Sequence, residues 1–229
     1  MRQYHKYFVF SFLAAISACS SGDETTIDIG LGYAPVKVGL YQIYGVDQTE
    51  YSELAGPVET HYELKTEVVD SFPNVSGVFT YVIHRSTRET SQDSWVYKDT
   101  WSLAVDDQQV LLNEENIAFV KMKFPLRNNR QWNGNEYNIG DPDIYEMKSV
   151  NEPFTVDDQT FPLTMFIDQE DVEDLLIRDR RLEVFAKDVG LVYKEVTDLT
   201  YCDDVDCFGQ KEIKSGIIYK QSIISYGYN

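Results

Sequence analysis

Apolar and polar residues alternate along much of the chain. Between residues 60 and 70, one set of alternate positions holds Tyr62, Leu64, Thr66 and Val68, and most positions between them are charged. This period of two predicts a half-buried antiparallel strand. Polar or glycine-bearing segments separate further runs of this kind, which begin at Phe79, Trp95, Ala118, Leu182, Val189 and Ile217. We expect about ten strands in an all-β, mainly antiparallel fold: a curved sheet, a half-barrel or a sandwich.

One segment has a different period. Between residues 168 and 181, Val172, Leu175 and Leu176 recur at helical spacing behind an acidic first turn. This spacing predicts one short helix. Because the helix would be short, we expect it to cap or plug the sheet.

The N-terminal residues predict a secretory signal peptide. Arg2 and Lys6 lie in a basic head, and an apolar run follows from residue 7 to residue 16. The run is too short for a bilayer-spanning helix, which needs roughly 20 residues. We expect residues 1–18 to be removed from the mature protein.

The end of this segment resembles a bacterial lipobox. Ile16, Ser17 and Ala18 precede Cys19 as one aliphatic and two small residues. The resemblance implies lipidation of Cys19 with a diacylglyceryl group and acyl chains such as palmitate, which would hold the chain on a membrane. Ser20, in place of an aspartate, implies the outer membrane and leaves the periplasmic and cell-surface faces open. The alternative is a plain signal peptide followed by an unrelated cysteine.

The sequence after Cys19 changes in composition at about residue 34. Residues 20–33 include three glycines and few apolar residues, so we expect residues 19–33 to form a flexible tether. The chain is 43% hydrophobic and 14% aromatic, which suffices for a packed core. We expect residues 34–229 to form a single β-rich domain.

The charge of the chain excludes some partners. The chain has 20 Lys and Arg residues against 38 Asp and Glu residues, a net charge of −18. Such a surface repels the phosphates of nucleic acids and of anionic lipid head groups. We therefore expect no nucleic-acid partner, and contact with the membrane through the lipid anchor alone.

Two cysteines remain after Cys19. Cys202 and Cys207 are close in sequence, and in an export compartment they would form a disulfide that closes an acidic hairpin end. The alternative is calcium binding by Asp203, Asp204 and Asp206. Their spacing does not match a helix-loop-helix calcium loop, so we favour the disulfide and expect no metal or cofactor.

Four stretches carry a wider resemblance. They are APVKVGLYQIYGVD (34–47), FVKMKFPL (119–126) followed by WNG (132–134), AKDVGLVYKEV (186–196), and the closing residues 217–227. On these stretches the chain resembles a family of uncharacterised, lipid-anchored, β-rich bacterial lipoproteins. The resemblance covers nearly all of the mature chain and implies a curved antiparallel sheet onto which Trp132 packs. It implies no activity, because the family has no assigned reaction.

Catalytic motifs are absent from the sequence. It has no H-x-x-x-H, G-x-S-x-G or phosphate-binding glycine loop, and alternation places His61 on a polar face and His84 near a strand end. We expect both histidines at the surface and a protein that is not an enzyme. The alternative is an envelope hydrolase that uses two carboxylates across a cleft.

Asp99 interrupts an aromatic strand face. It lies between Tyr97 and Trp101, where a buried carboxylate would need a partner or a raised pKa. We favour a strand bulge that turns Asp99 outward.

Aromatic residues are the candidates for ligand binding in a non-enzymatic envelope protein. The partner could be a lipid, a glycan or another envelope protein. A lipid carrier predicts a deep apolar pocket lined by Trp95, Tyr97 and Trp101. A glycan-binding protein predicts exposed Trp132 and Tyr137, since amphipathic aromatic side chains suit such surfaces. A scaffold predicts neither feature.

Overall fold

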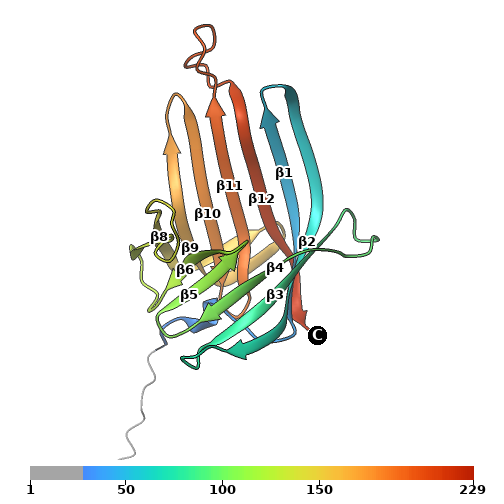
Figure 1. The fold of residues 1–229 in the computed structure, drawn as a ribbon, viewed down its shortest axis with the longest axis vertical. Coiled ribbons are helices and arrows are strands. Elements are labelled where there is room, and N and C mark those ends of the chain that lie inside the picture. The colour runs from blue at the N-terminus through green and yellow to red at the C-terminus, as the bar shows by residue number, and fades with distance from the viewer. Residues whose placement is uncertain (1–27) are drawn as a thin grey trace, which may run out of the picture.

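The structure is a computed structural model that describes residues 28–229. Twelve antiparallel strands form one nearly closed, barrel-shaped sheet (Figure 1), which confirms the prediction of an all-β antiparallel fold. The elements are η1 (Leu31–Tyr33), β1 (Leu40–Ser52), β2 (Ala55–Pro73), β3 (Phe79–Arg88), β4 (Val96–Val105), β5 (Gln109–Glu114), β6 (Ile117–Lys123), β7 (Gln131–Asn133), β8 (Ile144–Val156), β9 (Gln159–Glu173), β10 (Ile177–Ala186), β11 (Gly190–Tyr201) and β12 (Ile213–Tyr228).

The sheet joins two meanders. Its strand order is β6-β5-β4-β3-β2-β1-β12-β11-β10-β9-β8-β7, so the first and last strands lie side by side in the middle. The edge strands β6 and β7 meet at the opposite side. There, the Val120 N–H donates to the Gly134 carbonyl at 2.8 Å, and Trp132 Nε1 donates to the Val120 carbonyl at 2.7 Å. These hydrogen bonds bring the ends of the sheet together around an interior.

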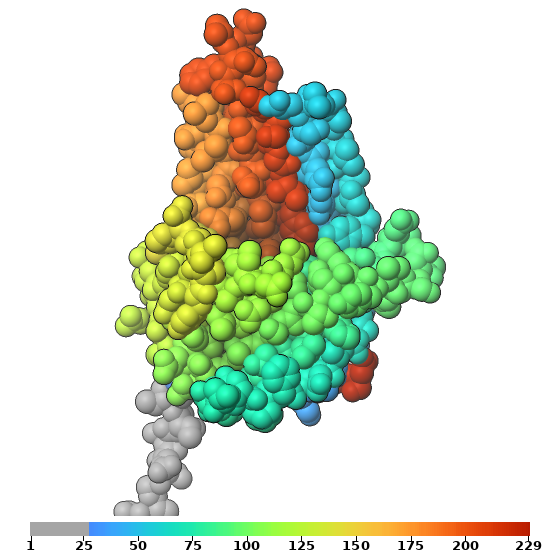
Figure 2. Space-filling model, viewed as in Figure 1, coloured from blue at the N-terminus to red at the C-terminus, as the bar shows by residue number. Residues whose placement is uncertain are grey.

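The strands differ in length, which leaves one end of the interior open. Strand β2 pairs with β1 from Ala55 to Glu67, but its pairing with β3 begins only at Glu63. The long strands β1, β2 and β10–β12 therefore extend beyond β3–β6 in Figure 1. Figure 2 shows the surface of β10–β12 exposed above the rim that β4–β6 form. The interior is thus accessible from this end.

Two clusters of buried residues form the core. One cluster lies between β5–β6 and β7–β9 and contains Trp132, Met147 and Ile167. The other includes residues of β1, β10 and β11 together with Val156 and Phe161 from the two sides of the β8–β9 turn. The turn thereby covers part of β10, so both faces of that strand are buried.

The predicted helix at residues 168–181 is wrong. These residues form the end of β9, a turn and the start of β10. Asp174 Oδ1 accepts the N–H groups of Leu176 at 2.7 Å and Ile177 at 2.9 Å, which fixes the turn. The apolar side chains at helical spacing do not meet a core: Val172, Leu175 and Leu176 are 41%, 50% and 44% exposed.

The end of the predicted tether belongs to the folded part of the chain. Tyr33 is buried in the core cluster, and its hydroxyl donates to Asn151 Oδ1 at 2.7 Å. The carbonyl of Ile29 accepts the Leu126 N–H at 3.0 Å. The flexible tether predicted up to residue 33 is therefore wrong for residues 29–33. The predicted signal peptide and Cys19 lie outside the described residues. Within residues 28–229, no helix has the length and hydropathy needed to cross a bilayer.

Candidate functional site

A cavity of about 440 Å³ lies in the interior of the sheet. This volume is within the range of small-molecule binding sites, about 300 to 1,000 Å³. Its walls come from both meanders, so the cavity exists only because the sheet curves back on itself. Apolar and aromatic walls include Ile83, Trp101, Leu103, Leu112, Phe185, Val196 and Tyr219.

Glu183 forms the first polar group of the cavity. Its side chain on β10 is only 3% exposed. Lys121 Nζ on β6 donates to Glu183 Oε1 at 2.6 Å, and Lys194 Nζ on β11 lies 3.5 Å from the same oxygen. Lys121 also lies 4.0 Å from Glu114 on β5. Four strands thus bring together two cations and two carboxylates that line one cavity.

The pKa values of this group show that its charges are retained. Burial alone would raise the pKa of Glu183, but the neighbouring Lys121 and Lys194 outweigh burial and lower that pKa. Burial alone would lower the pKa of Lys121, but Glu183 and Glu114 raise it. Each charge stabilises its partner against the cost of burial. Glu183 is therefore ionised at neutral pH.

Arg85 forms the second polar group. Its guanidinium stacks on the ring of Trp101 at 3.6 Å, and its Nη1 donates to Asp99 at 3.0 Å. The prediction that a bulge turns Asp99 outward is wrong. A bulge is present, but the register passes from Asp99 to Tyr97 and leaves Lys98 unpaired, so the bulge turns Tyr97 outward. Asp99 stays beside Arg85, which supplies the partner that a partly buried carboxylate needs.

Two tyrosines with altered pKa values lie in the wall of the cavity. The Tyr219 hydroxyl donates to Gln221 Oε1 at 2.7 Å, and Tyr62 is a neighbour that also lines the cavity. Burial raises the pKa of Tyr219, and the neighbouring Tyr62 raises it further. Burial also raises the pKa of Tyr62. Both hydroxyls are therefore neutral hydrogen-bonding groups rather than bases.

Three buried polar atoms of the cavity walls lack a hydrogen-bond partner among the described residues. They are Arg85 Nε, Trp101 Nε1 and Glu183 Oε2. As whole residues, Arg85 and Glu183 are only 7% and 2% exposed. A buried polar atom without a partner costs about 1 to 3 kcal/mol, so native proteins rarely leave several together. The three atoms thus leave unused hydrogen-bonding capacity in the side chains that line the cavity.

Bulges accompany each polar group. The register of β5 and β6 passes from Met122 to Val120 and leaves Lys121 as the extra residue. The register of β10 and β11 skips Val192, two positions before Lys194. With Lys98 beside Asp99, all three irregularities lie next to charged residues of the site. Bulges re-aim side chains and are common beside functional sites.

The predicted aromatic residues do not share one site. Trp101 lines the cavity. Tyr97 is 60% exposed and packs edge-on against His84. Trp95 stacks with Arg88 at 4.2 Å.

Two further candidates lie elsewhere. Trp132 is buried in the core, where its ring meets Tyr145 edge-on, as the family resemblance implies. Tyr137 is 52% exposed, and its hydroxyl accepts a hydrogen bond from Gln109 at 3.3 Å. Of the five aromatic residues predicted to bind a ligand, only Trp101 lines the cavity.

The sequence analysis did not predict the charged residues of the cavity, Glu183 and Lys121. Alternation assigns Glu183, between Leu182 and Val184, to a polar outer face. Its burial follows from the cover on both faces of β10, which local sequence does not reveal. The one available signal was a single charge inside an otherwise apolar run, which also describes Lys121 between Val120 and Met122. Both histidines are at the surface: His61 has a side chain that is 68% exposed and contacts Asp47 at 2.7 Å, and His84 is exposed.

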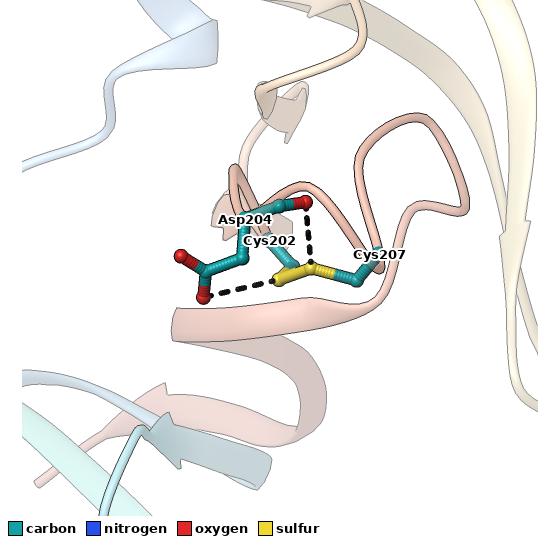
Figure 3. A group of neighbouring side chains, drawn as sticks. All are labelled: Cys202, Asp204 and Cys207. Atoms are coloured by element: carbon teal, nitrogen blue, oxygen red, sulfur yellow. Dashed lines mark hydrogen bonds between the residues drawn. A yellow bond between two sulfur atoms is a disulfide. The ribbon is translucent and has the colours of Figure 1, made fainter.

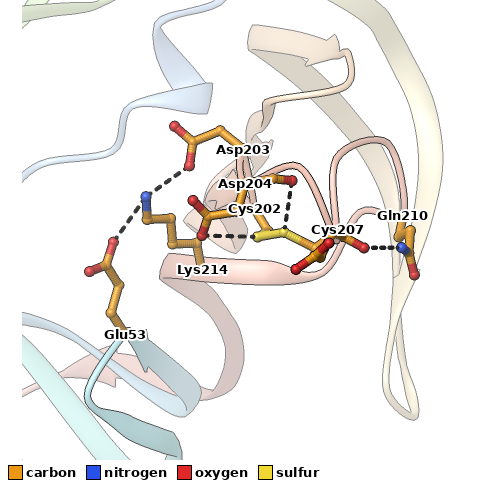
Figure 4. The surroundings of a disulfide bond; sticks show 8 residues. Glu53, Cys202, Asp203, Asp204, Cys207, Gln210 and Lys214 are labelled. Carbon is orange, nitrogen blue, oxygen red and sulfur yellow. Dashed lines mark hydrogen bonds and ion pairs between the residues drawn. A yellow bond between two sulfur atoms is a disulfide. The ribbon is translucent and has the colours of Figure 1, made fainter.

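The two remaining cysteines lie at disulfide distance at the far end of β11 and β12. The Cα atoms of Cys202 and Cys207 are 5.9 Å apart, and Figure 3 shows their sulfurs joined beside Asp204. Cys202, Asp204 and Cys207 are the described residues whose ligand atoms lie close enough to hold a metal ion, but the sulfurs bind each other. Asp203 instead contacts Lys214 at 2.9 Å, and Lys214 also contacts Glu53 at 3.2 Å (Figure 4). This loop is a cross-linked hairpin end.

Comparison with known proteins adds little to this description. No protein-family profile and no curated protein matches the chain. Among solved structures, the chain is similar to a chain from Bacteroides fragilis described as a "putative exported protein with YmcC-like fold". The TM-score is 0.44 at 10% sequence identity, over 84% of this chain and 97% of that chain. A likeness at this level supports no conclusion about function.

Proposed function

We propose that the chain is a non-enzymatic ligand-binding protein of the bacterial cell envelope, held on the outer membrane by a lipid on Cys19. The lipobox-like sequence before Cys19 supports the anchor. The cavity supports the binding role. Strands from both meanders enclose it, and one end of the sheet interior is accessible.

One observation carries the binding role. Arg85 Nε, Trp101 Nε1 and Glu183 Oε2 belong to side chains that line the same cavity, and none has a partner among the described residues. A ligand in the cavity would provide those partners after small movements of the side chains that cover the three atoms. A purely structural interior has no need of them, because apolar residues of similar volume stabilise as well as buried ion pairs or better.

The alternative of a carboxylate-dependent hydrolase has weaker support. Glu183 and Glu114 both contact Lys121 and could face one substrate. Such a hydrolase needs a protonated carboxyl group as its acid. Lys121 and Lys194 hold the pKa of Glu183 low despite burial, so Glu183 is unsuited to that role. The scaffold alternative predicts neither a deep apolar pocket nor exposed aromatic residues.

Native mass spectrometry of the purified protein tests the binding role. We expect the wild type to carry an additional non-covalent mass. Val196→Trp should reduce that mass strongly, because Val196 lines the cavity and a tryptophan ring would project into it and occupy part of its volume. The matched control is Thr197→Trp, at the next position of β11, which alternation places on the other face. A bare mass for the wild type would contradict the binding role.

Metabolic labelling tests the anchor separately. A labelled lipid precursor should attach to the wild type and not to Cys19→Ala. Label that persists in the variant would rule out the anchor at this residue.

A further inference from the structure

The charges around the cavity restrict the chemistry of its ligand. We propose that the cavity binds an uncharged molecule with hydroxyl or amide groups on an apolar body. This proposal rests on the binding role proposed above and names its ligand class. It follows from the charge balance of the site, from its unpartnered atoms and from its apolar walls.

The buried charges of the cavity are already paired within the protein. Glu183 contacts Lys121 at 2.6 Å and Lys194 at 3.5 Å. Arg85 contacts Asp99 at 3.0 Å. Lys98 and Glu115 also line the cavity, but both are exposed to solvent. An additional charge on the ligand beside the buried groups would find no free counter-charge among them, and an uncompensated buried charge is strongly unfavourable. Anionic and cationic ligands are therefore both disfavoured.

The unpartnered atoms favour a ligand with groups that both accept and donate hydrogen bonds. Arg85 Nε and Trp101 Nε1 are donors, so they need an acceptor. Glu183 Oε2 is an acceptor because Glu183 is ionised, so it needs a donor. Hydroxyl and amide groups provide both functions without a net charge.

The remaining walls suit an apolar body. Ile83, Leu103, Leu112 and Val196 contribute aliphatic surface, and Tyr62 contributes an aromatic ring. Burial of apolar ligand surface against these walls contributes roughly 25 cal/mol per Å². The cavity thus combines an apolar lining with a few polar atoms, as small-molecule sites usually do.

Three amphiphiles with the same tail separate the possible head groups. We would titrate the purified protein by calorimetry, below the micelle concentration, with octyl β-D-glucoside, octyl sulfate and octyltrimethylammonium. We expect octyl β-D-glucoside to bind at least tenfold more tightly than either charged probe. Val196→Trp should weaken its binding at least tenfold, and Thr197→Trp should leave it unchanged.

The outcomes distinguish this proposal from the one on which it rests. Equal or tighter binding of octyl sulfate or octyltrimethylammonium, lost in Val196→Trp, would overturn the ligand class and keep the binding role. Absence of binding by all three probes would also overturn the ligand class. Binding of the glucoside that Val196→Trp does not weaken would show that the cavity is not its site. The binding role itself falls only if native mass spectrometry finds a bare wild-type chain.

Discussion

The two halves of the sheet interior differ in what fills them. The half between β5–β6 and β7–β9 is packed with apolar side chains such as Met122, Met147 and Ile167, each fully buried. The half that faces β1–β4 and β10–β12 contains a cavity with Glu183 and Arg85 in its walls, and Lys121 of β6 lines it at the boundary between the two halves. The same sheet provides both halves, so the fold alone does not explain the difference.

We infer that the apolar half mainly stabilises the fold and that the charged half mainly binds the ligand. Close packing in the apolar half leaves no room for a ligand, and apolar burial there stabilises the fold. The charged half has paired ions and unpartnered polar atoms, both of which are costly in a structural interior. Substitutions in the two halves should therefore have different effects on unfolding and on binding.

The largest effect should follow from removal of Glu183. Glu183→Ala leaves Lys121 buried without its nearest counter-charge, so we expect the free energy of unfolding to fall by about 3 to 5 kcal/mol. The double variant Lys121→Met/Glu183→Leu removes both buried charges and should unfold with nearly the wild-type free energy, yet lose octyl β-D-glucoside binding. Denaturant unfolding and calorimetry measure the two effects. A double variant as unstable as Glu183→Ala would contradict this explanation.

A substitution that creates a void in the apolar half should lower stability without changing ligand binding. Ile167 is fully buried in the core cluster, and Ile167→Ala should lower the free energy of unfolding by about 2 to 5 kcal/mol. We expect the affinity for octyl β-D-glucoside to stay at the wild-type value under folding conditions. A tenfold loss of affinity would show that the two halves are not separable in this way.

Removal of the disulfide should have a smaller effect, remote from both halves. Cys202 and Cys207 are separated by 5 positions, so the closed loop is short. For a loop of this size, chain entropy predicts a loss of about 2 kcal/mol in Cys202→Ser/Cys207→Ser. Thermal unfolding should detect this loss, and ligand affinity should not change.

The most specific effect is the pH dependence of the charged half. The pKa of Glu183 is lowered in the folded protein, so its stabilisation is complete above its unfolded pKa of about 4.3 and is lost as the pH falls through the folded pKa. The pKa of Lys121 is raised, so its stabilisation is complete below about pH 10.4 and is lost as the pH rises toward the folded pKa.

Denaturant unfolding of wild type and Glu183→Gln from pH 7 to pH 3 measures how the contribution of Glu183 to the free energy of unfolding changes as the pH falls. The stability advantage of the wild type should shrink as the pH falls. An advantage that stays constant over this range would contradict the assignment of the low pKa to Glu183.

The fold was more predictable than the site. Alternation identifies one face of β2 through Tyr62, Leu64 and Thr66, and the structure places all three in the cavity wall. It fails where a turn depends on one side chain, because Asp174 fixes the β9–β10 turn through two hydrogen bonds that helical spacing does not reveal. The site depends on strands distant in sequence, such as β6 and β10, which meet only when the sheet curves back. The alternation of its strand identified Trp101 as a candidate ligand-binding residue, but it did not identify Arg85, whose guanidinium stacks on the Trp101 ring.

The indole signals of the three tryptophans offer the most direct test of the cavity. Trp101 lines the cavity and its Nε1 has no hydrogen-bond partner within residues 28–229, whereas Trp132 Nε1 donates to the Val120 carbonyl at 2.7 Å. Trp95 stacks with Arg88 on the β3–β4 side of the molecule. In NMR spectra assigned with single Trp→Phe variants, octyl β-D-glucoside should shift the indole N–H signal of Trp101 and leave that of Trp132 in place. A shift of Trp95 or Trp132 without a shift of Trp101 would contradict ligand binding in this cavity.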